Sequence, residues 1–166
     1  MPPIKLLILD LDGVLTRGFL PYDADGSEVK EFFVQDGGAI RRWQKEGNVA
    51  AIVSGRTSRA VDARAKDLGI RHLYQGVMDK MPAYESLKSA VDVRDEEIAF
   101  IGDDWLDLPP MRRCGYPIAP SNAAAAVKRA ARYVTRRSGG EGAVLEAIER
   151  LMRYNRNSRG PVAGSA

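Results

Sequence analysis

The chain has 166 residues, of which 45% are hydrophobic and 28% charged, and its formal net charge is +3. These values are ordinary for one globular domain with a sizeable core, and no apolar run is long enough to span a membrane. The first residues lead directly into a predicted strand, which leaves no room for a secretion signal, and the single cysteine excludes an internal disulfide, so we expect a cytoplasmic protein.

The first predicted element is an apolar run over residues 4–9 that ends in Asp10 and Asp12, followed by Gly13. A run with apolar residues on both faces is typical of a parallel strand that is buried on both sides. The two carboxylates can then project into a crevice at the carboxyl end of the strand. Carboxylates this close repel each other and invite a divalent cation, although Asp-x-Asp-Gly alone fits a simple polar turn equally well.

Residues 17–33 contain Asp25-Gly26 between two short segments, which is a strong signal for a β-hairpin. Its apolar side chains are Phe19, Leu20, Tyr22 and Val29. A hairpin this small must pack on something, either a partner subunit or its own domain.

After the hairpin, Asp36 is expected to cap a helix over residues 39–46. A second buried strand, residues 49–53, runs into the turn Ser54-Gly55-Arg56. A hydroxyl, a free backbone and a guanidinium at the end of a strand suit a phosphate group.

Strands and helices continue to alternate along the chain. Further helices are predicted over residues 58–68, 83–90, 123–132 and 143–154, and further short strands over residues 72–75, 98–101, 117–119 and 133–135. Repeated strand–helix units predict an α/β fold, a doubly wound parallel sheet with helices on both faces. Because ligands bind at the carboxyl ends of such strands, the polar residues at those ends should converge. These residues are Asp10, Asp12, Ser54, Lys80 and Asp103.

The last residues, 155–166, are rich in Gly, Ser, Asn and Arg and are predicted to be a disordered basic tail. Residues 1–154 would then form the domain. The tail has little aromatic interleaving, so we expect no nucleic-acid partner.

The predicted cluster of carboxylates, without a histidine or cysteine group, favours Mg²⁺. Together with a lysine, a serine hydroxyl and an arginine, it forms an anion pocket suited to phosphoryl transfer. One aspartate can attack phosphorus and form an aspartyl-phosphate. The second can give a proton to the leaving oxygen and later take one from the hydrolytic water.

In order and spacing, the chain resembles the haloacid dehalogenase superfamily of phosphohydrolases, whose four motifs match Asp10-Leu11-Asp12-Gly13-Val14, Ser54, Lys80 and Gly102-Asp103-Asp104-Trp105-Leu106-Asp107. The resemblance implies Asp10 as the nucleophile and Asp12 as the general acid and base. It implies that Ser54 and Lys80 hold the phosphoryl oxygens. The Mg²⁺ ligands that it implies are Asp10, the backbone carbonyl of Asp12, Asp103 and the supporting Asp107.

A narrower resemblance is to the capless subgroup that contains the 3-deoxy-D-manno-octulosonate 8-phosphate phosphatases. It rests on the hairpin, on Ser54-Gly55-Arg56 and on residues 33–37, 73–76 and 139–144. It implies a Rossmann-like fold without a cap domain, a homotetramer built on the hairpins with a neighbouring subunit over each site, and a role in lipopolysaccharide biosynthesis. The substrate-binding residues that it implies are Asp12, Phe33, Val34, Gln35, Asp36, Gly37, Arg41, Gly55, Arg56, Arg64 and Lys80.

Three functions stay open at this point. Arg56 favours the eight-carbon sugar acid phosphate, because relatives that act on nine-carbon ulosonates tend to carry glutamate there. The alternatives are a phosphatase for a nine-carbon ulosonate 9-phosphate or a broad set of sugar phosphates, and a non-catalytic oligomerisation module. Trp105 departs from the aliphatic residue expected in the last acidic motif.

Overall fold

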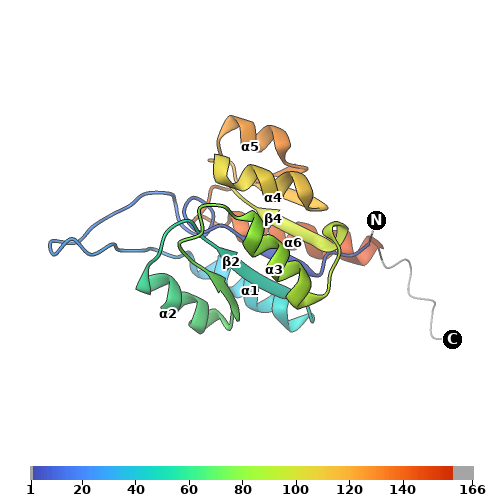
Figure 1. The fold of residues 1–166 in the computed structure, drawn as a ribbon, viewed down its shortest axis with the longest axis horizontal. Helices are drawn as coiled ribbons and strands as arrows, with labels where there is room; N and C mark the ends of the chain where they lie inside the picture. Colours follow the sequence, from blue (N-terminus) through green and yellow to red (C-terminus); the bar gives the residue numbers. More distant parts are fainter. Residues whose placement is uncertain (1, 159–166) are drawn as a thin grey trace.

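The computed structural model describes residues 2–158, which form a six-stranded sheet covered by helices (Figure 1). The strands are β1 (Leu6–Leu9), β2 (Val49–Val53), β3 (His72–Tyr74), β4 (Ile98–Ile101), β5 (Tyr116–Ala119) and β6 (Tyr133–Val134). They lie in the order β3-β2-β1-β4-β5-β6, and every neighbouring pair is parallel. From β1 the chain first adds β2 and β3 on one side and then β4, β5 and β6 on the other. The carboxyl end of β1 therefore lies at the switch point where such sheets bind ligands.

Helices cover both faces of this sheet, which confirms the predicted doubly wound α/β fold. They are α1 (Val34–Lys45), α2 (Arg59–Leu68), α3 (Met81–Val91), α4 (Leu108–Arg113), α5 (Ala125–Ala130) and α6 (Ala143–Ser158), with single 3₁₀ turns η1 (Asp95–Glu97) and η2 (Trp105–Asp107). None of the helices within residues 2–158 is long and apolar enough to cross a membrane.

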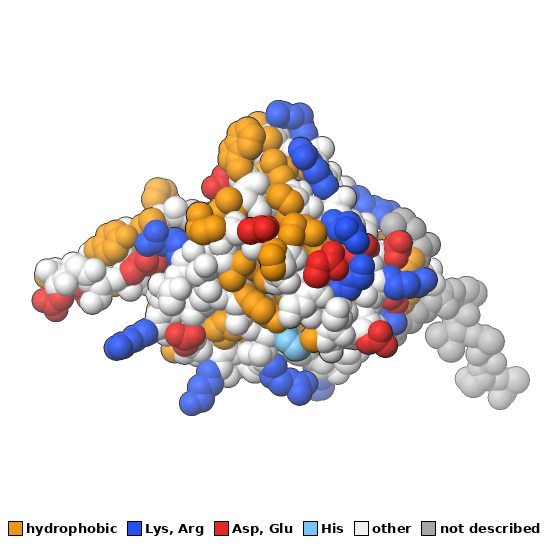
Figure 2. Space-filling model, in the orientation of Figure 1, with side chains coloured by type: hydrophobic (Ala, Val, Ile, Leu, Met, Phe, Trp, Pro, Cys, Tyr) orange, Lys and Arg blue, Asp and Glu red, His pale blue; other side chains and the backbone are white. Residues whose placement is uncertain are grey.

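The segment between β1 and α1 projects from the body as a hairpin-shaped loop (Figure 1). Its two arms meet at one bridge between Tyr22 and Glu28, and the turn is closed where the Asp23 amide donates to the Ser27 carbonyl. The predicted turn is therefore present, but the two arms form a single β-bridge instead of a continuous ladder of paired residues. Apolar side chains lie on the outside of the projection (Figure 2), and Phe19 is 76% exposed.

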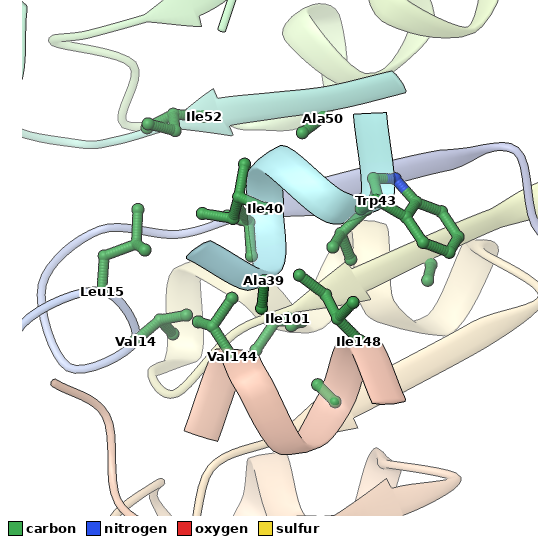
Figure 3. Packing of buried hydrophobic residues seen from close by; sticks show 14 of the residues in the cluster. Val14, Leu15, Ala39, Ile40, Trp43, Ala50, Ile52, Ile101, Val144 and Ile148 are labelled. Carbon is green, nitrogen blue, oxygen red and sulfur yellow. The ribbon is translucent and has the colours of Figure 1, made fainter. Parts of the chain in front are cut away.

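Two apolar clusters hold the helices on the sheet. In β1, Leu7 and Leu9 face α1, α2 and α6, whereas Leu6 and Ile8 face α3, α4 and α5. Successive strand residues point to opposite faces, so an uninterrupted apolar run buries both sides of the strand. Figure 3 shows the first cluster, in which Trp43 of α1 lies near the strands while α6 packs alongside.

Helix α1 begins earlier than predicted, at Val34, and Asp36 is not its N-cap. The prediction placed Gly37 and Gly38 before the helix, whereas both lie within α1. Gly37 lies close to Arg64 of α2, since a Cβ there would be 2.4 Å from Nη2 of that side chain. Asp36 lies in the first turn of α1 and uses its Oδ1 to accept a hydrogen bond from the Leu145 amide at the start of α6, 2.8 Å away. The carboxylate therefore stabilises the N-terminus of a different helix.

Helix α6 continues to Ser158, so the prediction that residues 155–158 belong to a disordered tail is wrong. The reason is a pair of hydrogen bonds that the sequence pattern does not reveal. The Asn155 side chain accepts from the amide of Ile4 and donates to its carbonyl, both at 2.7 Å. The remainder of the predicted tail, residues 159–166, lies outside the described residues.

Candidate active site

The carboxyl ends of the strands open into a cavity of about 240 Å³. It is lined by Asp10, Asp12, Gly18, Ser54, Gly55, Arg56, Lys80, Asp103, Asp104, Leu106 and Asp107. The predicted convergence of polar residues at the ends of β1, β2 and β4 is thus present in the structure.

At the floor of the cavity, one lysine bridges two buried carboxylates. Lys80, immediately before α3, places its Nζ 2.6 Å from Oδ1 of Asp10 and 2.6 Å from Oδ1 of Asp107. The other oxygen of Asp107 accepts from the backbone amides of Asp103 and Asp104, at 3.0 and 3.1 Å. Asp107 therefore fixes both the lysine and the loop that follows β4.

The pKa values of these groups reflect crowding of negative charge in a buried space. Burial and the charge of Asp107 raise the pKa of Asp10 to about 6, although Lys80 acts in the opposite direction. Burial and the charges of Asp10 and Asp107 raise the pKa of Asp103 to about 8. Burial alone would lower the pKa of Lys80, but the two carboxylates raise it above its ordinary value. The site thus holds more negative charge than its one lysine neutralises.

The surplus carboxylates fit a divalent cation. Oxygen atoms of Asp10, Asp103 and Asp107 all lie within 4.8 Å of one another. Oδ1 of Asp103 is buried and has no hydrogen-bond partner among the described residues. A Cβ at Gly13 would be 2.0 Å from Oδ2 of Asp103, so only glycine at that turn leaves space for the carboxylate. An all-oxygen donor set suits Mg²⁺, and these aspartates are the residues that would hold it.

Asp12 lies at the side of the cavity nearest the hairpin. Its Oδ1 contacts Nζ of Lys30, and Oγ1 of Thr16 is 3.5 Å from the same oxygen. Lys30 in turn contacts Glu28. No sequence pattern distinguishes Lys30, because a lysine in the arm of a hairpin is usually solvated.

The phosphate-suited turn after β2 is also at the cavity. Ser54 is buried, and its Oγ accepts from the Arg56 amide at 3.2 Å. The Arg56 guanidinium reaches the hairpin, where it donates to Oε2 of Glu28 at 2.8 Å and to the Tyr22 hydroxyl at 3.3 Å. The hairpin therefore contacts both the turn after β2 and the turn after β1.

The other predicted substrate-binding residues do not line this cavity within the described chain. Residues 33–37 form the N-terminal cap and first turn of α1. Arg41 and Arg64 each pair with Asp67 at 2.9 Å, and the Arg64 guanidinium lies 5.5 Å from the centre of the Phe32 ring. Their role in substrate binding stays a prediction.

A second residue that the sequence reasoning missed supports the turn after β1. Asn122 donates to the Gly13 carbonyl at 2.9 Å and accepts from the Gly139 amide at 2.7 Å. It follows β5, so its position at the end of a strand was a signal that could have identified it. A Cβ at Gly139 would lie 1.8 Å from the Gly13 carbonyl oxygen, which explains why this position holds glycine.

Comparison with known proteins adds a family context to this geometry. Residues 72–148 match the family profile of the haloacid dehalogenase-like hydrolases. The chain is 40% identical to the 3-deoxy-D-manno-octulosonate 8-phosphate phosphatase of Yersinia pestis over 149 residues, which cover 90% of this chain and 80% of that protein. The crystal structure of the Yersinia pestis phosphatase aligns with a TM-score of 0.90 and 39% identity, over 95% of this chain and 85% of that one.

A further similar structure is that of the same phosphatase from Moraxella catarrhalis, in complex with a magnesium ion, a phosphate ion and a KDO molecule. It aligns with a TM-score of 0.89 and 38% identity, over 96% of this chain and 92% of that one. Sequence and fold are thus similar to those of these phosphatases over most of the chain.

Proposed function

Because this chain belongs to the haloacid dehalogenase-like hydrolases and, within them, to the family of the 3-deoxy-D-manno-octulosonate 8-phosphate phosphatases, we propose that it is a magnesium-dependent phosphatase that releases phosphate from that eight-carbon sugar acid phosphate. The observation that carries the proposal is the cavity in which Asp10, Asp12, Ser54 and Lys80 meet. A non-catalytic oligomerisation module would need none of these side chains in one cavity.

In the mechanism that we propose, an oxygen of Asp10 forms a bond to phosphorus while the bond to the sugar oxygen breaks. Asp12 gives its proton to the departing oxygen. Water then loses a proton to Asp12 and attacks the aspartyl-phosphate, which releases phosphate and restores Asp10. Ser54 and Lys80 hold the phosphoryl oxygens. A bound Mg²⁺ would neutralise negative charge shared by these oxygens and the aspartates.

We assign Arg56 to the sugar acid, because a guanidinium suits a carboxylate and Arg56 lines the cavity beside the phosphate-suited turn. The Moraxella catarrhalis complex with phosphate and KDO supports an eight-carbon product. We further propose that the enzyme serves lipopolysaccharide sugar synthesis in the cytoplasm.

We also infer a homotetramer in which the hairpins associate. Its support is the exposed apolar surface of the projection and the position of residues 33–37, Arg41 and Arg64 outside the cavity of their own chain. In the tetramer the exposed side chains among them, such as Val34 and Arg41, would act on the site of a neighbouring subunit. Sedimentation of the wild-type chain and of Phe19→Ser tests this, since the variant should dissociate.

Phosphate release with Mg²⁺ tests the proposed reaction. The panel comprises the eight-carbon and nine-carbon ulosonate phosphates and simple hexose phosphates. We expect a strong preference for the eight-carbon acid and no turnover by Asp10→Asn, a change that replaces one oxygen with an amide without altering the side chain's size. Turnover by Asp10→Asn at the wild-type rate would refute the mechanism, and equal rates across the panel would refute the substrate.

A further inference from the structure

We propose that Lys30 of the hairpin is a positioning residue that holds the Asp12 carboxylate by one oxygen for proton transfer to the leaving group. This inference rests on the proposed function of Asp12 as the general acid. It assigns a role in the reaction to a hairpin side chain that does not itself line the catalytic cavity.

Lys30 has an unusual environment for a lysine in a projecting loop. Its side chain is 1% exposed, whereas the apolar neighbour Val29 is 44% exposed. Burial of an ammonium group is unfavourable unless charged partners surround it. The reversal of the usual arrangement, with the cation inside and the apolar residue outside, therefore points to a function for the inner side chain.

The partners of Lys30 form a chain of alternating charges that leads to the site. Its Nζ contacts Oδ1 of Asp12 and Oε1 of Glu28, and the other oxygen of Glu28 accepts from Arg56 at 2.8 Å. Glu28 thus lies between Arg56 and Lys30, and Lys30 links it to Asp12. Hydrogen bonds from Arg56 and Lys30 lower the pKa of Glu28, which keeps it charged as the link between them.

The contacts to the Asp12 carboxylate all involve one of its two oxygens. Among the described residues, the hydrogen bonds and ion pair that its carboxylate makes all go to Oδ1, from Lys30 and Thr16. The second oxygen, Oδ2, is left to exchange the proton with the leaving oxygen and with water. A carboxylate held by one oxygen cannot rotate freely, and general acid catalysis depends on such alignment.

Substrates with different leaving groups distinguish a role of Lys30 in proton donation from a merely structural role. An alkyl phosphate such as a sugar phosphate releases an alkoxide that needs the proton of Asp12, whereas p-nitrophenyl phosphate releases a phenolate stable enough to depart without it. The ratio of kcat/KM for the alkyl substrate to kcat/KM for the aryl substrate therefore reports proton donation. kcat/KM includes only the steps up to the first irreversible one, so hydrolysis of the aspartyl-phosphate does not enter it.

We expect Lys30→Met to lower kcat/KM for the alkyl phosphate by about 10- to 100-fold and for the aryl phosphate by only about 3-fold or less. Glu28→Gln keeps the contact between Lys30 and Asp12 and should leave the ratio near the wild-type value. Lys88→Met is a matched control, since Lys88 pairs with Asp95 at 2.8 Å and does not line the catalytic cavity.

Lys30→Met leaves Asp12 without its cation and Glu28 with Arg56 alone, which can impair folding. The double variant Lys30→Met with Glu28→Gln removes one of those charges, and we expect it to show the same selective loss of alkyl phosphate hydrolysis. Equal losses for both substrates in the folded variants, or no loss for either, would overturn the proposal. If the wild type hydrolyses simple alkyl phosphates but not the sugar acid phosphate, the proposed substrate fails, while the leaving-group comparison still decides the role of Lys30.

Discussion

Binding of Mg²⁺ to the aspartate cluster should depend strongly on pH. Asp103 must lose its proton before it can ligate a cation, and its pKa is raised to about 8. At about pH 6, roughly one molecule in a hundred carries an ionised Asp103, against about half at pH 8. The affinity for Mg²⁺ should therefore rise about fiftyfold over this range. The pKa of Asp10, raised to about 6, makes the dependence steeper below that pH.

The free energy of unfolding of the metal-free protein should change with pH in the opposite direction to the affinity for Mg²⁺. A carboxyl with a raised pKa keeps its proton in the folded state after the unfolded chain, with its model value of 3.8, has ionised. The contribution of Asp103 to the free energy of unfolding is fully present below that value and is lost as the pH rises through about 8. Mg²⁺ should therefore raise the melting temperature more at about pH 8 than at about pH 6.

Titration calorimetry in two buffers with different ionisation enthalpies measures both quantities, the affinity and the protons released. Near pH 7 we expect about one proton per Mg²⁺ bound. Asp103→Asn should bind the ion weakly and release no proton. Asp104→Asn is the matched control, because an asparagine oxygen can still accept the hydrogen bond that Asp104 takes from the Trp105 amide. An affinity that stays constant from about pH 6 to 8 without proton release would refute the reasoning.

Other predictions concern the frame of the site. Asn155→Ala leaves the buried amide and carbonyl of Ile4 unpaired, so urea denaturation should show a loss of about 2–5 kcal/mol in the free energy of unfolding. Gly139→Ala forces a methyl group against the Gly13 carbonyl, and kcat/KM should fall sharply although circular dichroism stays near wild type. Burial raises the pKa of Cys114 to about 12, so a thiol reagent should label it in denatured but not in native protein.

The parts of the fold that the sequence predicted are those with a local cause. Apolar runs identified the central strands, because a strand buried on both faces needs no other pattern. Asp10 and Ser54 follow such runs directly and Asp103 follows one after a single glycine, so the topology of a parallel sheet was enough to bring them together. Lys80 was harder to predict from the sequence, because only its place beside the other motifs distinguished it from a surface lysine.

The features that could not be predicted depend on partners far away in the sequence. Asp36 looks like an N-cap of its own helix, yet its partner is an amide 109 residues further along. Asn155 looks like the start of a polar tail, yet it pairs with Ile4, near the other end of the chain and just before β1. In both cases a residue type with a strong local preference is used for a tertiary contact, and local patterns cannot report such a contact.

The hairpin shows how one short segment can carry two surfaces with different requirements. If its only task were to associate subunits, nothing would require a buried lysine on the inner side, where Lys30 contacts Asp12. If its only task were to hold Asp12, nothing would require Phe19 to be 76% exposed on the outer side. Each surface carries a cost, an ammonium group removed from water and an apolar ring placed in it. That both are present in one loop argues that the proposed assembly and the proposed proton transfer meet here, and that packing of the outer surface can reach the site through the contacts of Lys30, Glu28 and Tyr22.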